Sequence, residues 1–313
     1  MSQLNKLPGG LWPVMLTPFT PTNHVDTAGL EKLTRLYIDA GSSGLFANCL
    51  SSEMYQLTRE ERLEVCRTVV KAGAGAVPVI ATGTFSRDVS DNIEFIHRLH
   101  DTGVDAVVLI TSMLAEPDEN EEVLMHRLEQ ILNGTGTIPL GVYECPVPYK
   151  RLLSPALMGW MAATGRFLYH KDTSCNSGTL DRKIRAVAGS NLGFFNADTA
   201  TALDSLDSGA DGLSPISANF YPELYSYLLR EYRSGGRTDA LNRLHAFLTM
   251  MDRTTHNFYP YAAKVFLQRR GLPIQTVTRI PAETPGNADQ IRLHSLMDSF
   301  HALADQYSIP SVL

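Results

Sequence analysis

One lysine in this chain has a setting that suits covalent chemistry. Lys171 follows residues 167–170, a short apolar and aromatic run that predicts a buried strand. Burial disfavours the charged ammonium, so part of such a lysine exists as the free amine that attacks a carbonyl carbon. Lys171 is therefore a candidate for Schiff-base formation. The alternative is a lysine that extends to solvent or pairs with Asp172 or another acid, as most lysines do.

A tyrosine ends another predicted strand and supplies the second half of this chemistry. When an amine adds to a 2-oxo acid, some group must carry protons to and from the carbinolamine, and the hydroxyl of Tyr143 can do so. The alternative is an aromatic ring that only packs at the end of its strand. Because side chains alternate across a strand, Glu144 and His170 point to the opposite face and are left out of the catalytic pair.

The elements that would position these residues alternate along the chain. Eight short apolar runs are typical of buried strands, and they occupy residues 11–16, 44–47, 77–81, 106–110, 138–143, 167–169, 192–195 and 212–213. Segments with helical spacing lie between and after them, at 27–40, 58–72, 88–101, 119–132, 154–163, 178–188, 199–208, 219–233, 238–251, 259–270 and 289–306. This alternation predicts a parallel sheet.

Eight strand–helix units predict a (β/α)8 TIM barrel, an α/β fold. A doubly wound sheet would typically have fewer strands and a Gly-x-Gly-x-x-Gly turn after its first strand, which is missing here. Glycines 41, 103 and 209 each stop a predicted helix just before a strand, which is a weak internal repeat. We expect the barrel over residues 1–233 and a C-terminal helical extension over residues 234–313.

In a barrel the chemistry gathers at the carboxyl ends of the strands, so the polar residues that follow each run are the candidate site. Those expected to bind substrate are Thr17, Ser51, Ser52, Asp198 and Ser214. Asp198 has two equal interpretations: it hydrogen-bonds substrate hydroxyls, or it caps a helix that begins at Thr199.

Composition excludes several classes of protein. The 313 residues carry 27 Lys plus Arg against 33 Asp plus Glu, a formal charge of −6, and no basic run, so we expect no nucleic-acid or membrane partner. No leader and no apolar segment of about 20 residues is present, which predicts a cytoplasmic protein. The four cysteines lack any paired spacing, and no metal or cofactor is expected.

Several short motifs occur in an order that is similar to one known family. Gly10 with Thr17-Pro18-Phe19 opens the barrel, Ser51 and Glu53 follow the second strand, Tyr143 and Pro146 follow the fifth, and Lys171-Asp172 the sixth. In this the chain resembles the dihydrodipicolinate synthase and N-acetylneuraminate lyase family of class I aldolases, over residues 10–219. The resemblance implies an imine at Lys171, proton transfer by Tyr143, carboxylate binding by Ser51 and Ser52, a hydroxyl of Thr17 in the proton relay, and dimers or tetramers.

The chain also departs from that family. Leu50 replaces a relay hydroxyl, Cys49 and Ser52 replace two glycines, and Leu114 lies where dihydrodipicolinate synthases have a second tyrosine that reaches a neighbouring subunit. Authentic dihydrodipicolinate synthase activity is therefore not expected. Three functions stay open: a lyase for a pyruvate-type 2-oxo acid, a 2-keto-3-deoxy sugar acid dehydratase that shares the imine, and a non-catalytic relative that binds a 2-oxo acid or amino acid.

Overall fold

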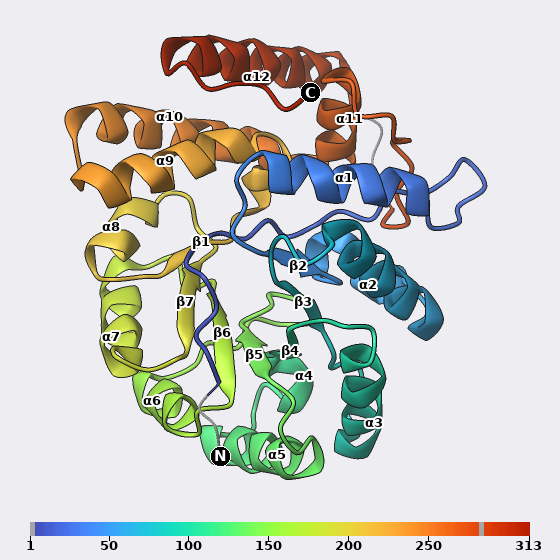
Figure 1. Cartoon of the computed structure of the whole chain (residues 1–313), viewed down its shortest axis with the longest axis vertical. Helices are drawn as coiled ribbons and strands as arrows, with labels where there is room; N and C mark the ends of the chain where they lie inside the picture. The colour runs from blue at the N-terminus through green and yellow to red at the C-terminus, as the bar shows by residue number, and fades with distance from the viewer. Residues whose placement is uncertain (1–3, 282–284) are drawn as a thin grey trace. The chain divides into compact units, whose positions relative to one another are not determined.

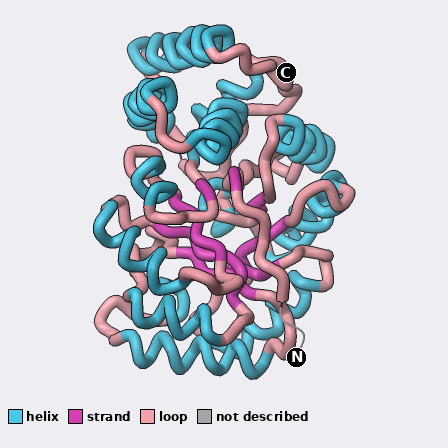
Figure 2. Tube along the Cα trace, turned by 60° about the vertical axis from the view of Figure 1, so that its left-hand side comes forward, coloured by secondary structure: helices cyan, strands magenta, loops and turns pink. Residues whose placement is uncertain are grey.

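Strands and helices alternate along the chain in the predicted order. The computed structural model describes residues 4–281 and 285–313, and it contains eight strands separated by helices (Figures 1 and 2). The strands are β1 (Gly10–Leu11), β2 (Leu45–Ala47), β3 (Val79–Thr82), β4 (Ala106–Ile110), β5 (Leu140–Tyr143), β6 (Phe167–Asp172), β7 (Gly193–Asn196) and β8 (Gly212–Leu213). The fold is a (β/α)8 barrel with a C-terminal helical part, so the predicted fold class is confirmed.

The chain divides into two compact units. One joins the segment that ends at Gly9 to residues 78–213, and the other joins residues 10–77 to residues 214–313. Both units thus combine segments that are distant in sequence. The expected boundary at residue 233, between barrel and helical extension, stays a prediction.

Strands β3 to β8 belong to the first unit and pair in sequential order, each parallel to the next. Their side chains are buried throughout, as expected for a parallel sheet whose two faces are both covered. The helices of this unit are α3 (Val89–His100), α4 (Thr111–Leu114), α5 (Glu121–Gly134), α6 (Pro155–Ala163), α7 (Ser177–Val187) and α8 (Ala202–Asp207). Helices α5, α6 and α7 lie outside the strands in Figure 1.

The second unit holds β1, β2 and most of the C-terminal helices. Its helices are α1 (Thr27–Asp39), α2 (Arg59–Gly73), α9 (Pro222–Gly235), α10 (Asp239–His256), α11 (Tyr261–Arg269) and α12 (Asn287–Gln306), with short 3-10 turns η1 (Leu50–Ser52), η2 (Met54–Gln56) and η3 (Ile216–Asn219). The predicted start of α2 is confirmed: Thr58 and Glu61 form a reciprocal capping box.

The structure differs from prediction at a few boundaries. The run 11–16 is a strand only over β1, because Pro13 has no N–H to donate to a sheet, and Val14 then makes an isolated bridge with Phe46. Helix α8 begins at Ala202 rather than Thr199. The helical turn α4 was not predicted, since four residues are too few for a periodic pattern. Among the described residues, no helix combines the length and the apolar character that a membrane span requires.

Candidate active site

Lys171 and Tyr143 lie side by side on adjacent strands of the first unit. Tyr143 is the last residue of β5, and Lys171 of β6 is its partner in the parallel register. The Nζ atom of Lys171 lies 4.8 Å from the centre of the Tyr143 ring. Both residues are nearly inaccessible, with exposed fractions of 2% and 3%. The structure therefore brings together the two residues that the sequence proposed as a catalytic pair.

Strand β6 is longer than predicted, which changes the setting of Lys171. The sequence placed the lysine just after the strand, but β6 continues to Asp172 because Lys171 and Asp172 also pair with Phe195 and Asn196 of β7. The backbone of Lys171 is thus paired on both sides, with β5 and with β7. A side chain on such a backbone is held more rigidly than one on a loop.

A buried ionic cluster occupies the other face of these two strands. Glu144 and Asp172 directly follow Tyr143 and Lys171, and alternation along the strand turns them to the opposite face. The Lys183 ammonium, from helix α7, donates to Glu144 Oε1 at 2.5 Å and to Asp172 Oδ2 at 2.7 Å. All three of these cluster side chains are fully buried. The predicted catalytic pair excludes Glu144 by strand parity, and Lys183 is not among the predicted site residues.

His170 is the fourth member of this cluster. Its Nε2 atom lies 3.5 Å from Asp172 Oδ2, and its ring packs against Phe194 with ring centres 5.0 Å apart. The ring is completely buried. The structure therefore combines the packing role that the sequence suggested for His170 with a close approach to Asp172.

The two carboxyl groups of the cluster respond oppositely to their surroundings. Burial raises the pKa of Glu144, with the neighbouring Asp172 acting in the same direction, and these effects outweigh the charges of His170 and Lys183. Burial alone would also raise the pKa of Asp172, but the hydrogen bonds and charges of His170 and Lys183 hold it well below its usual range. Asp172 is therefore the more firmly ionised partner of Lys183.

Three residues of the cluster have side chains of the kinds that bind metal ions. Glu144, His170 and Asp172 each offer a ligand atom, and the three atoms lie within 4.8 Å of one another. The Lys183 ammonium already contacts both carboxylates. A divalent cation bound there would face this ammonium at close range, so the cluster fits an internal cation better than a metal.

Asp198, also in the first unit, is engaged within its own chain segment. Its Oδ2 atom accepts hydrogen bonds from the backbone N–H and the hydroxyl of Thr201, at 3.0 and 2.7 Å, just before α8 begins at Ala202. This resembles the capping interpretation, although the helix begins later than predicted. Its contact with substrate hydroxyls stays a prediction.

The loop that follows β2, in the second unit, carries the predicted carboxylate-binding residues. The Ser52 hydroxyl donates to Met15 O at 2.6 Å, and the Thr17 hydroxyl donates to Ser52 O at 2.8 Å. Ser214, the last of the predicted substrate-binding residues, likewise donates to a main-chain carbonyl, that of Trp12, at 2.8 Å. The hydroxyls of Thr17 and Ser52 brace the backbone around the loop, and direct contact of Thr17, Ser52 or Ser214 with substrate stays a prediction.

Ser51 has a different partner, which the sequence did not indicate. Its side chain acts on the buried hydroxyl of Tyr259, where it opposes the rise in the pKa of Tyr259 that burial causes, and the Tyr259 hydroxyl accepts from the Asn219 amide at 2.6 Å. Asn219 in turn accepts a short hydrogen bond from Tyr37 and donates to Val14 O at 2.8 Å. Ser51 thus neighbours a chain of hydrogen-bonded polar groups formed by Tyr259, Asn219 and Tyr37.

Glu53 anchors the same loop to the C-terminal helices. Its Oε1 atom accepts from Lys264 Nζ at 2.7 Å, and its Oε2 atom accepts from the backbone N–H groups of Arg279 and Ile280. Glu53 and Lys264 are both fully buried. Glu53 itself has a positive φ of 57°, a conformation that is uncommon for residues other than glycine, so its carboxylate interactions hold a strained turn in place.

The chain matches a known protein family over most of its length. The sequence model of the dihydrodipicolinate synthetase family matches residues 7–299. The chain belongs to this family. Members are class I aldolases and lyases, so the protein is an enzyme of that class.

Members of this family are similar to the chain over most of its length. A 4-hydroxy-tetrahydrodipicolinate synthase from Methylococcus capsulatus is 29% identical over 275 residues, which are 85% of this chain and 90% of that protein. The solved dihydrodipicolinate synthase from Bacillus anthracis is 23% identical, with a TM-score of 0.84 over 95% of this chain and 99% of its own. A prophage member of the family from E. coli K12, solved with pyruvate, is 24% identical, with a TM-score of 0.82 over 96% and 99%.

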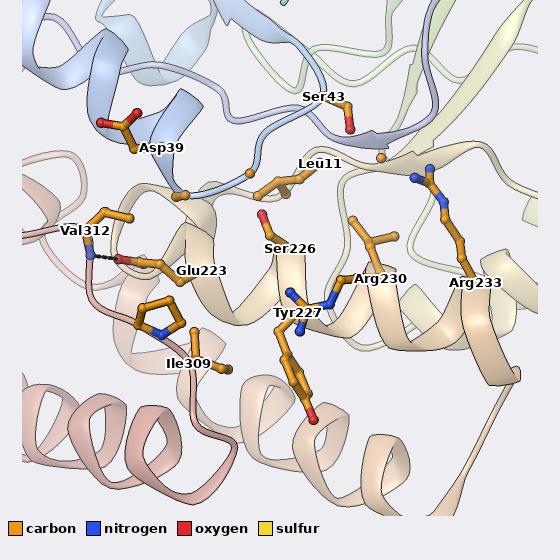
Figure 3. Close-up of a pocket in the computed structure, with 15 residues that line it drawn as sticks. Leu11, Asp39, Ser43, Glu223, Ser226, Tyr227, Arg230, Arg233, Ile309 and Val312 are labelled. Carbon is orange, nitrogen blue, oxygen red and sulfur yellow. Dashed lines mark hydrogen bonds between the residues drawn. The ribbon is translucent and has the colours of Figure 1, made fainter.

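The second unit of this dihydrodipicolinate synthetase family member contains a cavity. It has a volume of about 420 Å³, and its walls come from residues 10–43, from helix α9 and from residues 309–312 (Figure 3). Arg230 and Arg233 line it together with apolar side chains such as Leu11 and Ile309. None of the residues expected to act on substrate lines this cavity.

Proposed function

We propose that this chain is a Schiff-base lyase that cleaves or condenses a pyruvate-type 2-oxo acid through an imine at Lys171. The observation that carries the proposal is the register pairing of two buried residues, Lys171 and Tyr143, with the amine 4.8 Å from the ring centre. The pyruvate in the related E. coli K12 protein supports this choice of substrate class. The carboxyl ends of the strands in this fold are where such chemistry is found.

Lys171 and Tyr143 divide the reaction between them. The Lys171 amine attacks the ketone carbon of the 2-oxo acid, and the carbinolamine loses water with a proton from the Tyr143 hydroxyl. In the cleavage direction, the Tyr143 oxygen then removes the proton of the substrate hydroxyl. The C–C bond breaks, an aldehyde leaves, and the electron pair moves into the imine to give an enamine. Protonation of the enamine and hydrolysis release the 2-oxo acid and the free amine.

Ser51 is our choice for holding the carboxylate of the substrate. Of the two loop serines, Ser52 donates its hydroxyl to a backbone carbonyl, whereas the Ser51 side chain neighbours the hydroxyl of Tyr259. A hydrogen bond from an oriented hydroxyl to a carboxylate is stronger than one between neutral groups. Thr17 and Ser52 then act by bracing the loop, and Asp198 and Ser214 complete the proposed substrate-binding set.

The activity that we propose differs from that in the relatives' names. Leu50 has no hydroxyl to relay a proton, and Leu114 occupies the position of the second tyrosine of dihydrodipicolinate synthases. Leu114 lies in α4 and is 2% exposed. An apolar, buried side chain transfers no proton to a neighbouring subunit. We therefore propose a substrate other than that of the 4-hydroxy-tetrahydrodipicolinate synthases.

Product analysis separates the proposed lyase from its alternatives. With a panel of 2-keto-3-deoxy sugar acids, a lyase releases pyruvate and an aldehyde, whereas a dehydratase releases water and keeps the carbon chain whole. NMR of the reaction mixture distinguishes these products. A non-catalytic relative would bind a 2-oxo acid without turnover, and Lys171→Ala would leave its affinity mostly intact.

The family resemblance also leads us to propose a homo-oligomer, a dimer or a tetramer. Light scattering coupled to size-exclusion chromatography tests this directly. A monomer at micromolar concentration would contradict it.

A further inference from the structure

A buried ionic cluster takes no part in the chemistry proposed above, and it consists of Glu144, His170, Asp172 and Lys183. It lies on the face of β5 and β6 opposite to Tyr143 and Lys171. Glu144 follows Tyr143 in the chain, and Asp172 follows Lys171. Their side chains reach the sheet face that helix α7 covers, where Lys183 contacts both carboxylates. The cluster therefore joins the ends of β5 and β6 through their side chains, one residue beyond each proposed catalytic group.

Further contacts tie the same two strand ends together. The Thr173 backbone N–H donates to Glu144 Oε2 at 3.2 Å, and the Thr173 hydroxyl donates to Glu144 O at 2.7 Å. The backbone N–H of Leu153 donates to Glu144 Oε1 at 2.7 Å, which fastens the loop that follows β5. The Glu144 side chain is thus the meeting point of both strand ends and this loop, and Lys183 supplies its charge partner.

A fully buried lysine between two buried carboxylates is costly unless each group is paired. Stability alone is poorly served by such an arrangement, because apolar side chains of similar volume often stabilise a protein equally well. Charged hydrogen bonds do, however, fix geometry, since they have short distances and preferred directions. A misplacement of about 1 Å in reacting groups can slow a reaction by about a hundredfold.

We propose that Lys183 is a positioning residue for the Lys171–Tyr143 pair, acting by bridging Glu144 and Asp172 and so fixing the ends of β5 and β6. This inference rests on the proposed function, because it concerns the same imine chemistry. Lys183 touches neither substrate nor reacting atoms in this account. Its removal should therefore slow imine formation and leave the binding of the 2-oxo acid nearly unchanged.

The test is the rate of borohydride-trapped adduct at increasing pyruvate concentration, which separates the maximal rate from the half-saturating concentration. For Lys183→Met we expect a maximal rate about 10–100-fold below wild type, with a half-saturating concentration within about threefold. Arg185→Met is the matched control on the same helix, because the Arg185 side chain is 77% exposed, and it should trap at the wild-type rate.

A second variant addresses the chance that Lys183→Met does not fold. Lys183→Met/Glu144→Gln removes one charge of each sign, so a single buried carboxylate, that of Asp172, remains where Lys183→Met leaves two, and the bridge is still broken. Circular dichroism and thermal unfolding establish that it is folded, and we expect the same slow trapping. A folded variant of either kind that traps at the wild-type maximal rate overturns the inference, as does failure of both variants to fold. Absence of any adduct in the wild type instead overturns the proposed function.

Discussion

The amine of Lys171 lies over the ring of Tyr143, 4.8 Å from its centre, and the two residues are register partners on neighbouring strands. Their relative position is therefore set mainly by the hydrogen-bonded backbone of β5 and β6. A phenol beside an amine supplies both the nucleophile and the proton carrier that imine formation needs.

Tyr143→Phe keeps the ring and removes only the hydroxyl. If the hydroxyl moves protons, kcat for cleavage of the active 2-oxo acid should fall by about 10²–10⁴, the usual contribution of a general acid–base group. The trapped adduct at Lys171 should still form, only more slowly. Steady-state kinetics and timed trapping measure both effects, and a kcat within about threefold of wild type would contradict the assigned role.

Ser51→Ala removes the proposed hydrogen bond to the substrate carboxylate. A hydrogen bond to a charged group is worth about 1.5–3 kcal/mol, so the half-saturating pyruvate concentration should rise at least about tenfold. Tyr259→Phe, which removes the hydroxyl beside Ser51, should raise this concentration less. Tyr307→Phe is the control. Among the described hydrogen bonds, the exposed hydroxyl of Tyr307 makes only one, to Ala240 O. Unchanged saturation in Ser51→Ala would remove Ser51 from the site.

The Glu53–Lys264 pair should be important for stability. Lys264→Met leaves the buried carboxylate of Glu53 without its cation, so the free energy of unfolding should fall by about 3–5 kcal/mol. The double variant Lys264→Met/Glu53→Gln should recover part of this loss, because no uncompensated charge remains. Urea unfolding measures both, with Lys71→Met, an exposed lysine of α2, as control. A double variant less stable than Lys264→Met would contradict this explanation.

Glu61 gives a prediction about pH. Its carboxylate is paired with the Arg279 guanidinium, which lowers the pKa of Glu61 from 4.5 to about 2. The pKa of Glu61 is lower in the folded protein than in the unfolded chain. Its ion pair therefore stabilises the protein fully at pH values above the unfolded-state pKa, and this stabilisation declines as the pH falls toward about 2. Wild type should therefore be more stable than Glu61→Gln at pH 7, and the difference should shrink between about pH 4.5 and 2. Urea unfolding at several pH values measures it, and a difference that grows on acidification would contradict the ion-pair account.

The strands were predictable because their runs are short, apolar and buried. β4 (Ala106–Ile110) and β8 (Gly212–Leu213) lie at the predicted residues. β6 was underestimated because His170, Lys171 and Asp172 are polar and read as loop residues, whereas in the structure they pair with both neighbouring strands and are buried. Local composition cannot show that a charged side chain has a buried partner from another element.

The candidate site was predicted only in part, because local sequence does not show which partners come from distant elements. Lys171 and Tyr143 follow from strand ends and parity, but Lys183 and Tyr259 lie on or next to distant helices and meet their partners only in the folded chain. For Lys183 a signal did exist: it occupies the apolar stripe of α7 with Leu180, Ile184 and Val187, at helical spacing. A lysine in such a stripe predicts a buried ion partner.

The most direct test of the central claim is intact-protein mass after incubation with pyruvate and sodium borohydride, followed by peptide mapping. We predict one reduced pyruvyl group per chain, located on Lys171 and missing from Lys171→Ala. An unmodified protein, with pyruvate and with longer 2-oxo acids alike, would contradict the proposed imine. So would an adduct on another lysine with Lys171 unmodified.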